Sequence, residues 1–134
     1  MIFVDTSAWY ALEVEDEINH EKARSFLSEL ATGQHGVVIT TDYVLDETMT
    51  LLKSKKGLLV AASFIDKIRK SKSVRVFWVS ESIFDKALGI FKKTADSQWS
   101  FTDCTSFALM KDLAITKAFT LDNHFKQAGF HKLP

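Results

Sequence analysis

The chain has 134 residues, which fits one domain and leaves little room for a second. Seventeen basic and seventeen acidic side chains balance, so net charge argues neither for nor against a nucleic-acid partner. A single cysteine excludes an internal disulfide, and no Cys/His cluster has zinc-site spacing. The amino terminus lacks a secretory signal pattern, and no apolar run approaches the ~18 residues of a membrane span. We therefore expect a cytoplasmic protein that does not act at a membrane.

Short apolar runs alternate with longer amphipathic stretches along the chain. The runs are rich in β-branched and aromatic residues and are too short for helices, which favours strands. In chain order the expected elements are a strand at 2–4, a helix from 23 with Gly33 as its C-cap, a strand at 37–39, a helix from 44 to about 57, a helix over 58–68, a strand at 74–79, a helix over 83–91 with Ser80 as its N-cap, a helix over 107–114 that Asp103 begins, and a strand at 118–120.

Strands that are apolar on both sides and separated by helices indicate a parallel sheet covered on both faces. We therefore predict one α/β domain over residues 1–134, folded as a three-layer α/β/α sandwich around a parallel sheet. Ligands of such open sheets bind at the carboxyl ends of the strands. Chemistry is expected at that edge.

Two acidic residues follow predicted strands. Asp5 comes directly after the first strand, and Asp122 follows the strand at 118–120 almost as closely. Both side chains are therefore expected at the carboxyl edge of the sheet. A purely structural alternative is that each one caps the next helix, because Asp is a favoured N-cap residue.

Two further acids lie on predicted helices. Glu47 lies at the border of an apolar stripe, in line with Leu51 one turn later, and Asp103 shares a face with Phe107. A carboxylate on an apolar face costs several kcal/mol unless something compensates it. The alternatives are a glutamate that packs on the rim of the core, and an N-terminal cap for which Thr102 competes with Asp103.

Together the four acids predict a cation site. They come from strand ends and from helices that flank the same edge, so they can converge on one pocket. Like charges ~4 Å apart repel by about 1–4 kcal/mol per pair, so the cluster needs protons or cations to neutralise it. Oxygen ligands without soft donors select Mg²⁺ or Mn²⁺. Such ions support attack of a water molecule on a phosphate, which is the mechanism we infer.

Four segments resemble the motifs of the PIN domain, and in particular those of the small VapC-type toxins of toxin–antitoxin pairs. These segments are 3–9 (FVDTSAW), 45–48 (LDET), 100–104 (SFTDC) and 120–125 (TLDNHF). The resemblance covers nearly the whole chain and implies a five-stranded parallel sheet, dependence on Mg²⁺ or Mn²⁺, and endonucleolytic cleavage of RNA. It makes Asp5, Glu47, Asp103 and Asp122 the catalytic metal ligands. Supporting roles around them fall to Thr6, Ser7, Thr102 and Asn123.

The same resemblance implies a homodimer and a partner antitoxin that occupies the active-site groove. Two alternatives stay open: a housekeeping RNA-processing nuclease, and a catalytically silent binding module, against which the intact acids argue. A phosphatase of the haloacid dehalogenase type would need a second Asp where Ser7 stands. A response-regulator receiver would need a paired acid near the first strand and a late lysine. The RNA target does not follow from the sequence.

An RNA substrate requires basic residues near the acids. The candidates are Lys53, Lys55, Lys56, Lys67, Arg69, Lys70, Lys72, Arg75, Lys92 and Lys93, although most of these fit solvated helix ends equally well. Trp9 and Trp99 lie near the first and third acids, where they would either stack on a base or belong to the core or a dimer interface. Cys104 is expected to be a buried, inert thiol. Among the histidines only His124, two residues after Asp122, merits a test.

Overall fold

The computed structural model describes all 134 residues and contains one sheet of five parallel strands. Their order across the sheet is β3-β2-β1-β4-β5. The strands are β1 (Ile2–Val4), β2 (Val38–Thr41), β3 (Val74–Phe77), β4 (Lys117–Phe119) and β5 (His131–Leu133). The predicted parallel sheet is confirmed. The apolar pattern does not predict β5, because this edge strand has the sequence His-Lys-Leu and is only partly buried.

Seven helices connect and cover the strands. They are α1 (Thr6–Glu13), α2 (His20–Leu30), α3 (Asp42–Lys56), α4 (Leu58–Lys70), α5 (Glu81–Lys93), α6 (Phe101–Asp112) and α7 (His124–Gln127). Gly57 separates α3 from α4 with a φ of +95°, which glycine adopts without strain. Ser80 caps α5 as predicted, because its side chain accepts a hydrogen bond from the backbone N–H of Ile83.

Several boundaries differ from those that the sequence predicts. The helix expected over 107–114 is α6, and it ends at Asp112; Ala114 lies beyond it, exposed and with a φ of +54°. Gly33 is not the C-cap of α2, which ends at Leu30; it forms part of the following turn. Two short helices, α1 and α7, were not expected, because neither has room for a long amphipathic stripe. The first predicted strand coincides with β1, and the limits of the other three shift by up to two residues.

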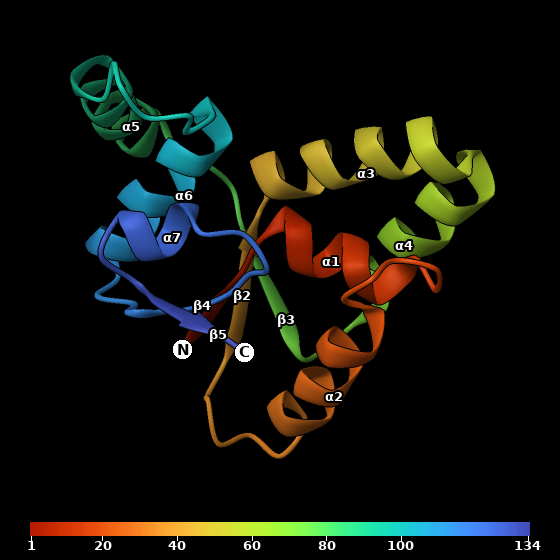
Figure 1. Cartoon of the computed structure of the whole chain (residues 1–134). Coiled ribbons are helices and arrows are strands. Elements are labelled where there is room, and N and C mark those ends of the chain that lie inside the picture. The colour runs from red at the N-terminus through yellow and green to blue at the C-terminus, as the bar shows by residue number, and fades with distance from the viewer.

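Helices cover both faces of the sheet. Figure 1 shows α1, α2 and α4 on one side and α6 and α7 on the other, and α5 packs on α6. Helix α3 begins at the carboxyl end of β2 and contacts α1, α4 and α6. This arrangement is the predicted three-layer sandwich. It brings the starts of α1, α3 and α6 to the edge where β1, β2 and β4 end.

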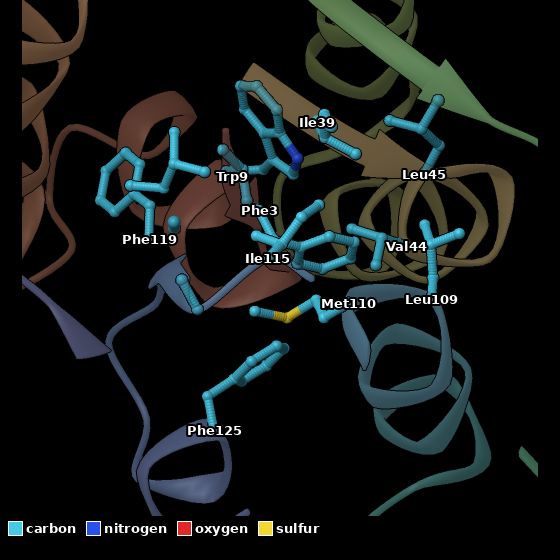
Figure 2. Close-up of a cluster of buried hydrophobic side chains, with 14 of the residues drawn as sticks. Phe3, Trp9, Ile39, Val44, Leu45, Leu109, Met110, Ile115, Phe119 and Phe125 are labelled. Carbon is cyan, nitrogen blue, oxygen red and sulfur yellow. The ribbon is translucent and has the colours of Figure 1, made fainter. Parts of the chain in front are cut away.

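The core contains 28 buried hydrophobic residues. On the α6–α7 side of the sheet, Phe125 of α7 stacks on Phe3 of β1 with ring centroids 5.9 Å apart, and it meets Phe107 of α6 edge to face at 5.0 Å. Figure 2 shows Met110 beside Phe125, and Leu109 next to Val44 where α6 meets α3. Helix α7 has only four residues, so these ring contacts fix its position.

No helix in the structure is long and apolar enough to cross a membrane.

Replacing Phe125 by Ala should lower the free energy of unfolding by about 3–5 kcal/mol, because the substitution opens a cavity among packed rings. Urea unfolding followed by circular dichroism measures this decrease. The matched control is Phe91→Ala, since Phe91 is 47% exposed and its truncation opens no closed cavity. Equal decreases in the two variants would contradict the anchoring role of Phe125.

Candidate active site

Asp5 is buried at the carboxyl end of β1, where it also caps α1. Its Oδ2 accepts hydrogen bonds from the Ser7 hydroxyl at 3.0 Å, the Thr120 hydroxyl at 3.1 Å and the Ser7 backbone N–H at 3.4 Å. Helix capping and a place among the acids therefore occur together at this residue, although the sequence presented them as alternatives.

Asp122 is tied to Asp5 through two hydroxyl groups. The backbone N–H of Leu121 donates to Ser7 Oγ at 2.9 Å, and that of Asp122 donates to Thr120 Oγ1 at 3.4 Å. Each hydroxyl thus accepts from the loop after β4 and donates to Asp5. The Asp122 carboxylate accepts from the His124 backbone N–H at 2.9 Å, an Asx-type turn that leads into α7. Thr120 was not among the residues that the sequence predicted for the site; its position between a buried strand and Asp122 was the available signal.

Asp103 lies in the first turn of α6, as predicted, but Ser100 and not Thr102 is the N-cap. Ser100 and Asp103 form a capping box, in which each side chain accepts a backbone N–H bond from the other residue at 3.0 Å. Asp103 Oδ2 also lies 2.9 Å from His124 Nδ1. The Ser-x-x-Asp pattern could have identified this cap. His124 contacts one of the acids directly, which its place in the sequence did not predict.

Glu47 lies on α3, half-buried, and the charges of Asp103 and Asp122 reach it. Thr6, at the start of α1, is 6% exposed, and its hydroxyl has no partner at hydrogen-bond distance. Burial raises the pKa of the Glu47 carboxyl, and the Thr6 hydroxyl opposes this rise. Asp46, the preceding residue, is exposed.

Burial and the charges of neighbouring acids act on Asp5, Glu47 and Asp103. Burial raises the pKa of Asp5 to about 7, and the charges of Asp122 and Asp103 act in the same direction. Burial also raises the pKa of Glu47, to which Asp103 and Asp122 add, and that of Asp103, to which Asp122 adds. The Ser100 N–H and His124 oppose the rise at Asp103. The structure therefore brings all four carboxylates to one edge, where their charges oppose each other.

The donor set is chemically suited to a hard divalent cation, because four carboxylates and the partnerless Thr6 hydroxyl supply oxygen atoms only. No three His, Cys, Asp or Glu side chains are close enough together to form a complete ligand group. Asp103 Oδ2 accepts a hydrogen bond from the Ser100 N–H and lies 2.9 Å from His124 Nδ1. The four carboxylates therefore lie at the same edge of the sheet without forming a complete set of ligands around one ion position.

The residues expected to support the acids differ in what they contact. Ser7 donates directly to Asp5. The carbonyl of Thr102 accepts from the hydroxyls of Thr105 and Ser106, but its side chain makes no hydrogen bond to an acid. Asn123 is exposed, and its Oδ1 accepts from the Lys132 ammonium at 3.1 Å. Lys132 also donates to the carbonyl of Leu121, so it holds the loop that carries Asp122.

The tryptophans, the cysteine and the basic residues that the sequence singled out have different surroundings in the structure. Trp9 belongs to the core, because it is buried and its indole N–H donates to Thr40 Oγ1 at 3.3 Å. Trp99 is half-buried and meets Phe107 edge to face. Cys104 is fully buried as predicted, and burial raises the pKa of its thiol. Two of the predicted basic candidates already form ion pairs, Lys56 with Asp16 and Lys67 with Glu13.

Comparison with known proteins finds similarity to one protein family and to two of its characterised VapC proteins. The PIN domain family model matches residues 2–131. The chain is 37% identical to the 23S rRNA-specific endonuclease VapC20 of Mycobacterium tuberculosis over 130 residues, which is 97% of this chain and 95% of that protein. It is 27% identical to a VapC ribonuclease of Archaeoglobus fulgidus over 123 residues, or 91% of this chain and 77% of that protein.

Solved structures agree. The crystal structure of M. tuberculosis VapC20, described as a sarcin-ricin loop cleaving toxin, superposes with a TM-score of 0.87 at 35% identity, covering 97% of this chain and 96% of that one. FitAcB from Neisseria gonorrhoeae gives a TM-score of 0.70 at 17% identity, covering 100% of this chain and 97% of that one. The second match supports the fold alone.

The raised pKa of Asp5 makes stability depend on pH. Because the folded state keeps this carboxyl protonated up to about pH 7 while the ordinary value is 3.8, folding binds protons in this window. In EDTA, the free energy of unfolding should therefore fall as pH rises from about 4 to 7, and Asp5 contributes at most about 4 kcal/mol to this fall. Glu47 and Asp103 add to the fall with the same sign.

Urea unfolding at several pH values measures this slope. Asp5→Asn should flatten it and should be the more stable form at pH 8, since Asn keeps the cap without the charge. Asp66→Asn, at an exposed carboxylate of α4, is the control and should leave the slope unchanged. An unchanged slope in Asp5→Asn would contradict the electrostatic strain assigned to the cluster.

Proposed function

Because the chain belongs to the PIN domain family, we propose that it is a metal-dependent endoribonuclease of the VapC type. The observation that carries this proposal is that Ser7 and Thr120 connect Asp5 to the loop of Asp122, while His124 connects that loop to Asp103. The fourth acid, Glu47, is half-buried on α3 within reach of the charges of Asp103 and Asp122. The names of the relatives point the same way, since both VapC proteins are described as nucleases acting on RNA. The name of VapC20 makes 23S ribosomal RNA the first substrate to test.

The four acids are the proposed ligands of Mg²⁺ or Mn²⁺. The chemistry that such an ion supplies is to orient a water molecule for in-line attack on phosphorus and to stabilise charge on the leaving oxygen. The chain's own part is to hold the ligands in place. Ser7 and Thr120 fix one oxygen of Asp5, and His124 with the Ser100 N–H fixes one oxygen of Asp103.

The raised pKa values also have a role in this proposal. Burial and mutual repulsion make the deprotonated cluster unfavourable without a counter-charge. A divalent cation relieves that repulsion, so it competes with protons for the same oxygens. Metal affinity should therefore increase with pH through the range in which Asp5 titrates.

We further propose that the protein is the toxin of a toxin–antitoxin pair and binds a partner antitoxin. A homodimer is part of it, and the α3–α4 pair offers an apolar surface that supports this state. A hollow of about 330 Å³ there is lined by Met49, Leu58, Ala61 and Ile65 among others. Leu58 is 63% exposed and Leu59 is 86% exposed. Exposed apolar side chains beside such a groove are typical of interaction surfaces.

The first test replaces the acids one at a time. Glu47→Gln, Asp5→Asn and Asp103→Asn should each reduce RNA cleavage by at least about a hundredfold, because each removes a charge that holds the cation. Cleavage of labelled RNA, resolved on gels, measures the effect, and circular dichroism checks the fold. Asp46→Asn is the matched control, since Asp46 is the exposed neighbour of Glu47 on the same helix.

EDTA should stop cleavage by the unmodified protein, and added Mn²⁺ should restore it. Cleavage that persists in EDTA would exclude the metal-dependent mechanism. Cleavage retained by Asp5→Asn or Asp103→Asn would remove those residues from the site.

The toxin role has a separate test in cells. Expression of the chain without a partner should arrest growth, whereas the Asp5→Asn form should be harmless because it lacks a ligand of the cation. Culture density after induction measures this difference, with equal protein levels verified by blotting. Identical growth of the two cultures would overturn the toxin role while leaving the nuclease chemistry to be judged in vitro.

A further inference from the structure

A hollow of about 600 Å³ lies beside the acids. Residues 93–99, which join α5 to α6, form most of its wall, and His124 and Gln127 of α7 complete it. Figure 1 shows this connection and α7 on the same side of the sheet. His124 belongs to both places, because its Nδ1 lies 2.9 Å from Asp103 Oδ2 while its residue lines the hollow. A ligand in the hollow would therefore be a neighbour of the acid cluster.

The wall of the hollow has the chemistry of a nucleobase site. The amides of Gln98 and Gln127 and the carboxylate of Asp96 offer both hydrogen-bond donors and acceptors. Trp99 adds an aromatic side chain, which also contacts Phe107 edge to face at 5.1 Å. Its indole N–H is buried and has no hydrogen-bond partner. Single-stranded RNA is recognised by such a combination of aromatic side chains and polar groups that contact the base edges.

A line of lysines continues from the hollow. Lys93 lines it and also lines a second hollow of about 420 Å³ between α5 and α6, where Lys86 and Lys111 lie as well. Lys86 is paired with Asp112, but Lys93 and Lys111 form no ion pair in the structure. Their charges are thus available to phosphates. Asp96 and the acid cluster repel phosphates, which separates a base-binding part from a phosphate-binding part.

We propose that the 93–99 hollow is a nucleotide subsite for RNA next to the cleaved bond. The base of a flanking nucleotide enters beside Trp99, and the phosphates that follow it run along Lys93 and Lys111. This inference rests on the proposed function, because it takes RNA as the ligand. It identifies Lys93 among the ten basic candidates of the sequence and adds Lys111, which was not one of them.

The test measures binding without cleavage. The probe is a short, fluorescein-labelled single-stranded RNA of mixed sequence, and the protein is the full chain carrying Asp5→Asn, in EDTA. Fluorescence anisotropy gives the affinity at several salt concentrations. Lys93→Glu in this background should weaken binding and should lower the slope of log K against log salt by about 0.7 for each phosphate that the protein no longer neutralises.

A second variant examines the base-binding part. Trp99→Phe keeps an aromatic ring against Phe107 but offers a smaller surface for stacking on a base, so affinity should fall about two- to tenfold. Lys22→Glu is the charge-matched control, because Lys22 is exposed on α2, on the opposite side of the sheet. It should bind RNA like the parent. Circular dichroism verifies that all variants are folded.

The outcomes separate the subsite from the proposed function. If the parent binds RNA and both Lys93→Glu and Trp99→Phe bind equally well, the subsite is wrong although the nuclease proposal stands. If Lys22→Glu weakens binding as much as Lys93→Glu, the effect is one of net charge and the subsite is again wrong. If the parent binds no RNA, the subsite is wrong, and the nuclease proposal is judged by the cleavage assays alone. In the cleaving protein, Lys93→Glu should raise KM with kcat little changed, since Lys93 does not touch the reacting phosphate.

Discussion

Repulsion among buried carboxylates is the constraint on which the rest of the site depends. Asp5 has left water almost completely, and the charges of Asp103 and Asp122 face it. Such an arrangement opposes folding unless protons or a cation offset it. The surrounding hydroxyls of Ser7 and Thr120 do not neutralise charge; they fix its position. An ordinary structural role for these acids would not require so many of them together.

The sequence predicted the layered fold because buried strands and amphipathic helices have distinct periods. It did not predict β5 from pattern, since a short edge strand need not be apolar. It also did not predict α1 and α7, which are too short for a long amphipathic stripe. Helix α7 is fixed by a contact between distant residues, Phe3 and Phe125. Boundaries failed where one residue decides the ending, as at Ala114 with its positive φ. The local sequence pattern therefore predicts the strands and long helices of the three layers, whereas the short elements between them depend on tertiary contacts.

The acids themselves were predictable, because an acid after a buried strand or on an apolar face needs a reason. The residues that contact the acids were harder to predict. Thr120 looks like any threonine that ends a strand, and His124 contacts Asp103 only because α7 folds back across 21 positions. Helix capping and membership of the acid cluster are not alternatives at Asp5 and Asp103, because each of these residues does both. A cap holds a carboxylate still, which is what a ligand also requires.

Helix α6 has eight consecutive buried residues, Asp103 to Met110, so it has no solvent face over two full turns. A helix enclosed on every side cannot turn or slide without disturbing the sheet, α3 and α5 at once. The connection before α6 and the exposed side of α5 should therefore tolerate substitution better than α6 does. Changes there leave the enclosed helix, and the carboxylate it carries, in place.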